Sequence, residues 1–151
     1  QDPASVLAYW QQLPGADKQN VTLASSAARS LMTAGRHDDA KNIIEQTLAK
    51  EWDASLVHLY GECRSADLIK QVEWADTQLK QNPNDADLLL ALGKFCTDLQ
   101  LWGKAQNYLD ASLAIEPKRE THLAMTRLLE KSGKPEDAAR HNRKSFYSDS
   151  E

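Results

Sequence analysis

The stretch PNDADLLLALGKFCTDLQLWGKAQNYLDASLAIEP, residues 83–117, decides the fold of this chain. Between its end prolines lie two segments whose apolar residues recur at intervals of three and four, as on one face of a helix. Small residues stand at Gly93 and Ala105, where two antiparallel helices would approach each other most closely. Pro117 has no amide hydrogen and ends the second segment. The stretch therefore predicts a hairpin of two helices.

The spacing within this hairpin resembles the tetratricopeptide repeat, which is about 34 residues long. Leucine stands in place of the usual tryptophan and of the usual phenylalanine, and cysteine in place of the usual tyrosine. The signature positions are Leu89, Leu92, Gly93, Cys96, Ala105, Leu109 and Pro117. The resemblance implies stacked helix pairs in a right-handed superhelix, with a concave groove lined by the first helix of each pair.

Other parts of the chain repeat these intervals. Ala28 and Ala40 are spaced as Gly93 and Ala105 are, Gly35 separates them, and Ala138 occupies the same place in a last unit. We therefore predict an all-α, tetratricopeptide-like right-handed α-α superhelix of about nine helices, one domain overall. Its expected parts are an N-terminal docking helix in 1–15, about four repeats within 16–147 (21–52, 53–84, 85–118 and 119–147) and a frayed tail at 148–151.

The second predicted repeat is degenerate. Residues 53–62 align without gaps on residues 85–94, so its first helix is expected to copy the first helix of the next repeat. The unit is shorter than its neighbour, which predicts a tighter turn between its two helices. The register of its second helix stays open.

Composition favours an ordinary globular protein. The 151 residues are 41% hydrophobic and 26% charged. The net charge of −4 gives no reason to expect nucleic acid as a partner. No apolar run is long enough to span a membrane. Cys63 and Cys96 are too few for a disulfide framework, so we expect both to be reduced and packed in helices. Because the sequence begins at Gln1 without a methionine, we expect it to be part of a longer protein.

Several motifs resemble the C-terminal region of the HemY family. The most specific is Leu101-Trp102-Gly103-Lys104-Ala105, because tetratricopeptide repeats in general do not require Trp-Gly-Lys there. Further matches are Tyr108-Leu109, Ser112-Leu113, Trp10 with Leu13-Pro14, Leu59-Tyr60-Gly61 and residues 88–94. The resemblance extends over nearly the whole chain.

Members of this family are proteobacterial inner-membrane proteins associated with a late step of protohaem biosynthesis. The resemblance implies a membrane anchor in segments absent here, a soluble repeat domain on the cytoplasmic face, and late haem-biosynthesis enzymes such as ferrochelatase as partners. The family name is shared with a flavin-dependent protoporphyrinogen oxidase of a different fold. This chain has no glycine-rich dinucleotide fingerprint and does not resemble that enzyme.

No group of residues predicts catalysis or metal binding. None of the four histidines lies three or four residues from another histidine or from a cysteine, the spacing that helical metal ligands need. His58 and Glu62, one turn apart, are explained more simply as a solvated pair. No acid–base pair, nucleophile motif or phosphate loop is present. We expect no enzyme activity, no metal and no cofactor, with haem or porphyrin as an alternative ligand.

The residue after each close-approach position is expected to point into the groove. It is Arg29 in the first unit, Lys94 in the third and Arg127 in the last, while Glu62 stands there in the second. Three cations facing one concavity would bind a carboxylate, either a partner's C-terminus or a tetrapyrrole propionate. The alternative is that they are solvated and paired with neighbouring acids such as Asp87 or Glu130.

Several functions are compatible with this pattern. The first is a protein-interaction scaffold, the repeat domain of a HemY-like membrane protein that acts in or regulates late haem synthesis. The others are a tetrapyrrole carrier or sensor, a peptide-binding module unrelated to haem, and a catalyst of a haem-synthesis step. Periodicity supports only the fold, because one repeat scaffold serves many functions.

Overall fold

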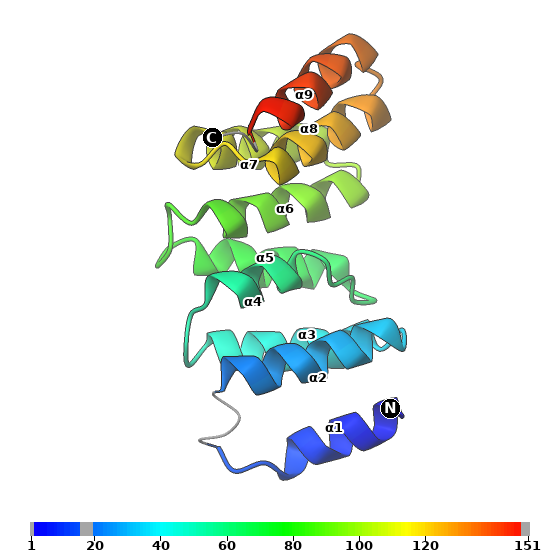
Figure 1. The fold of residues 1–151 in the computed structure, drawn as a ribbon, viewed down its shortest axis with the longest axis vertical. Coiled ribbons are helices and arrows are strands. Elements are labelled where there is room, and N and C mark those ends of the chain that lie inside the picture. Colours follow the sequence, from blue (N-terminus) through cyan, green and yellow to red (C-terminus); the bar gives the residue numbers. More distant parts are fainter. Residues whose placement is uncertain (1, 16–19, 149–151) are drawn as a thin grey trace. The chain divides into compact units, whose positions relative to one another are not determined.

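The computed structural model of this chain describes residues 2–15 and 20–148, with side chains described as far as Ser145. Nine helices and no strand run through these residues (Figure 1), which confirms the predicted all-α class. Their bounds are α1 Pro3–Gln12, α2 Val21–Thr33, α3 His37–Leu48, α4 Ala54–Tyr60, α5 Leu68–Gln78, α6 Ala86–Asp98, α7 Trp102–Ile115, α8 Arg119–Lys131 and α9 Pro135–Ser148. No helix in this part of the chain is long and apolar enough to cross a membrane.

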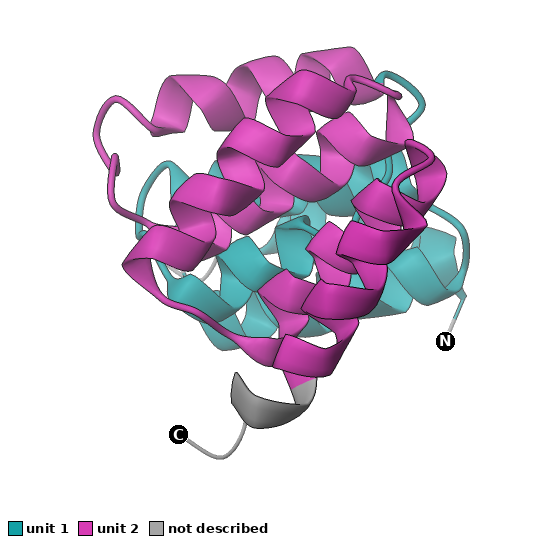
Figure 2. Cartoon of the chain, turned by 90° about the horizontal axis from the view of Figure 1, so that it is seen from above, with its two compact units in different colours: residues 1–67 teal, residues 68–151 magenta. Residues whose placement is uncertain are grey.

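The chain divides into two compact units, residues 1–67 and residues 68–151 (Figure 2). The boundary falls inside the predicted second repeat, 53–84, between its two helices. The prediction of a single domain with these repeat boundaries stays a prediction. Of the predicted tail, Ser148 is the last residue of α9, and the remaining positions lie outside the described residues.

Unit 1 contains a docked first helix and one helix pair. Trp10 anchors α1: its side chain is only 3% exposed, and its indole Nε1 donates a hydrogen bond to Gln46 Oε1 on α3 at 3.4 Å. The pair α2 and α3 packs through small residues, since Ala28 and Ala40 are fully buried. The Asn20 side chain begins α2 by accepting a hydrogen bond from the amide of Leu23.

Unit 2 contains two such pairs, α6 with α7 and α8 with α9 (Figure 1). Gly93 on α6 faces Leu109 on α7 so closely that an added Cβ would overlap the leucine side chain. The other signature side chains are also buried, namely Leu89, Leu92, Cys96 and Ala105, as is Ala138 on α9. Pro117 follows the end of α7 at Ile115 and is exposed.

The three helix pairs turn in the same way. In each turn the amide three residues past the last residue of the first helix bonds to a carbonyl five residues earlier, as in a Schellman motif. These bonds run from Arg36 to Leu31, from Leu101 to Cys96 and from Lys134 to Leu129. The residue before each amide has a positive φ: Gly35 at 80°, Gln100 at 62° and Gly133 at 82°. Gln100 is thus a side-chain-bearing residue in a place that favours glycine.

Replacing Gln100 with glycine is expected to stabilise the protein. The left-handed conformation costs a residue with a side chain ~1–2 kcal/mol, and the greater chain entropy of glycine offsets ~0.5–1 kcal/mol of that. We therefore expect Gln100→Gly to raise the free energy of unfolding by about 0.5–1 kcal/mol in urea denaturation. The matched control is Asn107→Gly in the interior of α7, which should lower it. If both variants change the free energy of unfolding equally and in the same direction, the turn at Gln100 is not strained.

The second predicted repeat departs from its expected form. Its first helix, α4, begins with Asp53 accepting from the amide of Leu56, just as Asp85 begins α6 by accepting from that of Leu88. However, α4 ends at Tyr60, whereas α6 continues to Asp98. The expected tight turn is therefore wrong: the helix is shortened, and residues 61–67 form a longer connection.

The first two residues of α3 hold this connection in place. His37 Nδ1 accepts a hydrogen bond from the amide of Arg64 at 2.9 Å, and Asp38 Oδ1 accepts one from that of Ala66 at 2.7 Å. The Cys63 thiol donates to the carbonyl of His37 at 3.2 Å. Cys63 is buried in this loop and not in a helix as expected, whereas Cys96 is buried within α6.

Candidate functional site

Two of the predicted groove cations lie together in unit 2. Lys94 on α6 and Arg127 on α8 line one cavity of about 220 Å³, with Thr97, Glu120, Leu123 and Ala124. We call this cavity the Lys94–Arg127 pocket. Its lining combines two cations, one carboxylate and the 41% exposed side chain of Leu123.

Helical spacing explains why these residues share one pocket. Lys94 and Thr97 are three positions apart on α6. The four residues from α8 fall at successive intervals of three, one and three, so they lie on one face of that helix. The buried Thr97 hydroxyl donates to the carbonyl of Gly93 at 2.8 Å and is used within α6. The donors available for a ligand are therefore the ammonium of Lys94 and the guanidinium of Arg127.

Both cations have acidic neighbours. Lys94 Nζ lies 3.6 Å from Glu120 Oε1, beyond ordinary hydrogen-bond length, with these side chains 22% and 38% exposed. Arg127 donates a hydrogen bond of 2.7 Å to Asp98 Oδ1. Exposed pairs of this kind contribute only ~0–1 kcal/mol, so a ligand carboxylate can compete for them.

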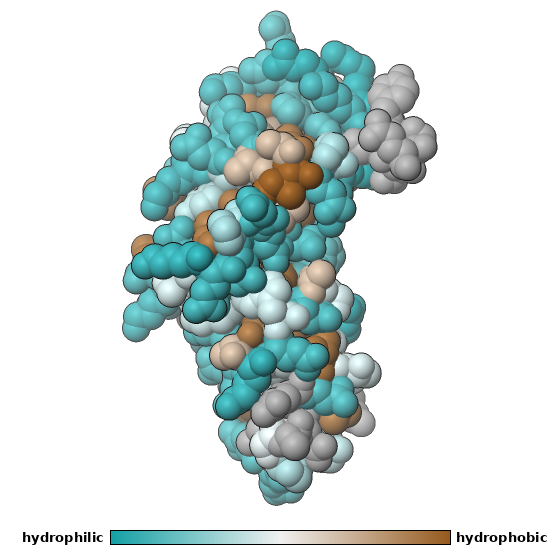
Figure 3. Space-filling model, turned by 90° about the vertical axis from the view of Figure 1, so that its left-hand side faces the viewer, coloured by the Kyte–Doolittle hydropathy of each residue, from teal (hydrophilic) through white to brown (hydrophobic). Residues whose placement is uncertain are grey.

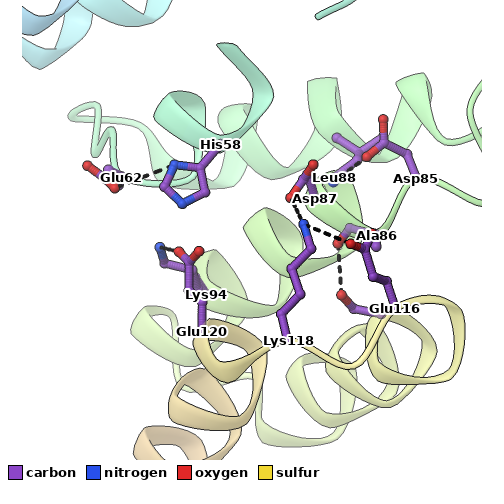
Figure 4. Close-up of polar contacts among 11 residues, drawn as sticks. His58, Glu62, Asp85, Ala86, Asp87, Leu88, Lys94, Glu116, Lys118 and Glu120 are labelled. Atoms are coloured by element: carbon purple, nitrogen blue, oxygen red, sulfur yellow. Dashed lines mark hydrogen bonds and ion pairs between the residues drawn. The ribbon is translucent and has the colours of Figure 1, made fainter. Parts of the chain in front are cut away.

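Asp87, one of the two acids predicted as partners for these cations, binds another lysine. Figure 4 shows Lys118 between Asp87 and Glu116, at 3.1 and 3.6 Å, and Lys94 beside Glu120. Partial burial acts to lower the pKa of Lys118, but the hydrogen bond and charge of Asp87, with Glu116, raise it above its ordinary value. Asp87 is thus committed to Lys118, which leaves Lys94 with Glu120.

The other two predicted groove residues lie in unit 1. Arg29 is exposed on α2, and we find no ion-pair partner for it within the described residues. Glu62 follows the end of α4, so it does not occupy the mid-helix position of Lys94 with which it was aligned. Its carboxylate lies 3.7 Å from His58 Nδ1, and the two side chains are 50% and 42% exposed. A groove shared by all four residues stays a prediction.

Sequence reasoning missed the residues that complete the pocket. Leu123 and Glu120, which line the pocket one and two helical turns before Arg127, were not singled out. Asp98, which lies outside the lining but binds Arg127, was also missed. Leu123 is also one of the few large apolar side chains exposed in the described structure. The full set is Tyr9, Ile69, Leu101, Ile115 and Leu123. Figure 3 shows a largely hydrophilic face on which apolar side chains gather only in small groups.

The two cysteines are poorly suited to bind haem iron. Burial raises the pKa of the Cys63 thiol to about 12 and also raises that of Cys96, so both remain protonated near neutral pH. A thiol must lose its proton to become an iron ligand. Within the described residues, no group of three or more His, Cys, Asp and Glu side chains could hold a metal ion.

Solved structures share this arrangement of helices. The chain is similar to TTC0263, a thermophilic TPR protein in Thermus thermophilus, with a TM-score of 0.66 and 18% identity over 97% of this chain and 91% of that one. It is also similar to MamA, with a TM-score of 0.64 and 16% identity over 95% of this chain and 86% of that one. A second MamA structure, designated AMB-1, gives a TM-score of 0.63 and 20% identity, over 98% and 90% of the two chains.

These likenesses concern the fold. No protein-family model matches the sequence, and no curated protein matches it. The resemblance to the HemY family therefore has no support beyond the motifs that suggested it. The nine helices of the described residues and the likeness to these solved structures together show an all-α, tetratricopeptide-like fold.

Proposed function

We propose that this chain is a protein-binding module that holds a carboxylate-bearing peptide segment in the Lys94–Arg127 pocket. The observation that carries the proposal is the placement of Lys94 and Arg127, from two different helices, around one cavity beside the exposed side chain of Leu123. Tetratricopeptide folds bury a core through helix stacking and leave helix faces for partners. The proposal needs no catalytic group and no cofactor.

The pocket suits a free C-terminus that ends in an apolar residue. The two cations provide charge-assisted hydrogen bonds to the carboxylate, with the guanidinium able to bind both oxygens. Leu123 would contact the apolar side chain of the same terminal residue. A cavity of about 220 Å³ admits one or two residues, not a folded domain.

A bound carboxylate would take the place of one acidic side chain. The contact of Lys94 with Glu120 is the longer and weaker of the two, so Glu120 is the group most easily displaced. Asp98 would keep Arg127 oriented at 2.7 Å. In this arrangement Lys94 forms a new ion pair with the ligand carboxylate. The guanidinium N–H groups of Arg127 that do not bind Asp98 donate hydrogen bonds to the same carboxylate.

The test uses short peptides with an apolar last residue, each made with a free and with an amidated C-terminus. We expect the wild-type protein to bind the free-acid peptides and not the amides in fluorescence anisotropy. The variant Lys94→Ala/Arg127→Ala should lose at least tenfold in affinity, about 1.4 kcal/mol or more, because both donors to the carboxylate are removed.

The matched control is Lys104→Ala/Lys131→Ala. It removes the same charge from the exposed surface of α7 and α8, outside the pocket, and should bind as the wild type does. Equal losses of affinity in both variants would show that the protein attracts the peptides only through its overall charge. Equal affinity for free-acid and amidated peptides would show that the pocket does not bind a carboxylate. Measuring Arg29→Ala with the same peptides tells whether the site extends to α2.

The cellular setting is a separate proposal. The motif Leu101–Ala105 and the other HemY-like motifs suggest a partner among the late haem-biosynthesis enzymes at a bacterial inner membrane. Its test is a pull-down from such membranes with the same variants. Ferrochelatase recovered by the wild type and the control but not by the pocket variant would support this setting. Peptide binding without that recovery would leave a carboxylate-binding module with another partner.

A further inference from the structure

Two histidines that are far apart in the sequence meet in unit 2. His122 on α8 and His141 on α9 place their Nδ1 atoms 3.2 Å apart. Their ring centroids are 5.4 Å apart, and the ring planes are inclined by 33°. His122 is only 8% exposed, and His141 is half-buried. The two imidazoles therefore form a direct contact between α8 and α9 that is largely shielded from water.

The geometry limits how many protons this pair can carry. A hydrogen bond between two ring nitrogens needs one nitrogen with a proton and one without. In the neutral pair, one Nδ1 donates to the other. A first added proton can go to the far nitrogen of the donor ring, and the same hydrogen bond persists with a charge on its donor. A second added proton can go only to the accepting Nδ1, so two N–H groups would then face each other.

The charges around the pair also resist the second proton. On α9, Lys144 acts on both rings, and Arg140 acts on His141. On α7, Asp110 acts in the opposite sense on His141. Burial first, and then these cations and the neighbouring imidazole, lower the pKa of His141. Burial and Lys144 lower the pKa of His122.

Other contacts also hold α9 in place, because α8 and α9 pack against each other as extensively as α6 and α7 do. Ala138 and Ser145 are the buried residues of α9 within the described part of the chain. The Thr126 hydroxyl on α8 lies 3.3 Å from the carbonyl of Ala138, but it also donates to the carbonyl of His122 at 2.9 Å. The Ser145 hydroxyl donates to Asn142 of α9 itself. The histidine pair is thus a titratable contact within a larger packed surface between α8 and α9.

We propose that the His122–His141 pair is a proton-operated latch, in which the second added proton breaks the contact and weakens the packing of α9 on α8. Loosened in this way, α9 would expose more of the face of α8 that carries His122, Thr126 and Leu129. The device needs no ligand, and it is independent of the carboxylate pocket.

The direction of the pH effect follows from the lowered pKa values. A histidine that is harder to protonate in the folded protein than in the unfolded chain contributes its full stability above the ordinary pKa of 6.5. As the pH falls below that value, the unfolded chain takes up protons before the folded protein does. The stability of α9 therefore declines with falling pH until the pH reaches the lower pKa values of the folded pair. The latch is therefore closed at neutral pH and opens in acid.

The experiment follows the backbone amides of α9 and the ring nitrogens by NMR from about pH 8 to about pH 4.5, the range in which histidine titrates. In the wild type we expect two coupled titration steps for the pair, with the amides of Ala138–Ser145 moving toward unfolded positions at the lower step. His141→Gln cannot take the second proton, so its α9 amides should not move over this range. The control His58→Gln removes a half-buried histidine of unit 1 and should behave as the wild type does.

Two results would overturn the latch. One is a pair of independent titrations near the ordinary pKa, with the amides of α9 unmoved in the wild type. The other is loosening of α9 in His141→Gln at the same pH as in the wild type. Should His141→Gln already lack a helical α9 at pH 8, the ring titration of the wild type decides alone, since coupling of the two steps is measured without any variant.

Discussion

Replacing Gly93 with leucine is expected to lower the free energy of unfolding by ~1–3 kcal/mol, the usual cost of forcing extra carbons into a packed core. Gly93 is buried on α6, and a Cβ placed on it would overlap Leu109 Cδ2 and lie 2.5 Å from Leu109 Cγ. The carbonyl oxygen of Ala105 is 3.5 Å from the same point. The leucine cannot be accommodated unless α6 and α7 move apart, and that movement would loosen the middle of unit 2.

The matched control for this change is Gly103→Leu. Gly103 lies in the first turn of α7, and a Cβ added there meets no atom within 4 Å. Leucine also favours helix over glycine by somewhat under ~1 kcal/mol, so this variant should be as stable as the wild type or more so. Urea denaturation followed by helical circular dichroism compares the two. If both variants unfold at the same urea concentration, the helices do not approach each other at Gly93.

The helix pairs follow from local sequence patterns. The small residues and leucines of residues 83–117 predict the α6–α7 pair. They are spaced at helical intervals, and the two helices that they join are neighbours in the sequence. The glycines at 35 and 133 mark two of the turns for the same local reason. The Gln100 turn has the same conformation without a glycine, so only its position between two predicted helices reveals it.

The loop after α4 could not be predicted from such patterns. The alignment of residues 53–62 on 85–94 holds through Asp53 and its cap, but it gives no sign that the helix stops at Tyr60. What holds the loop is a set of hydrogen bonds from its backbone to His37 and Asp38, more than twenty residues earlier. Interactions over that distance leave no periodic signal in the sequence.

The candidate site was partly predictable for the same reasons. The repeat offset identified Lys94 and Arg127, which do share a pocket. It did not identify Leu123, because a single exposed leucine is common on a protein surface. Spacing rules also missed the contact of His122 with His141, since the residues lie on different helices. A biosynthetic role cannot be read from the fold at all, because tetratricopeptide-like scaffolds serve many functions.

The largest single loss of stability is expected for Leu109→Ala. The leucine is fully buried on α7, and truncation of such a side chain typically lowers the free energy of unfolding by ~2–5 kcal/mol, since it leaves a cavity. Ile115→Ala, at the 42% exposed end of the same helix, is the control and should lose much less. Similar losses in the two variants would contradict the packing described for α6 and α7.

A double-mutant cycle ties Leu109 to Gly93. On its own, Gly93→Ala places a methyl group where the Leu109 side chain lies, so packing strain should oppose its gain in helix propensity. After Leu109→Ala, the same methyl group enters the vacated space and fills part of the cavity. The double variant should therefore be more stable than the sum of the single changes by ~0.5–3 kcal/mol, as for residues in direct contact. Additive changes would mean that the two residues do not meet, and the close approach that organises unit 2 would have to lie elsewhere.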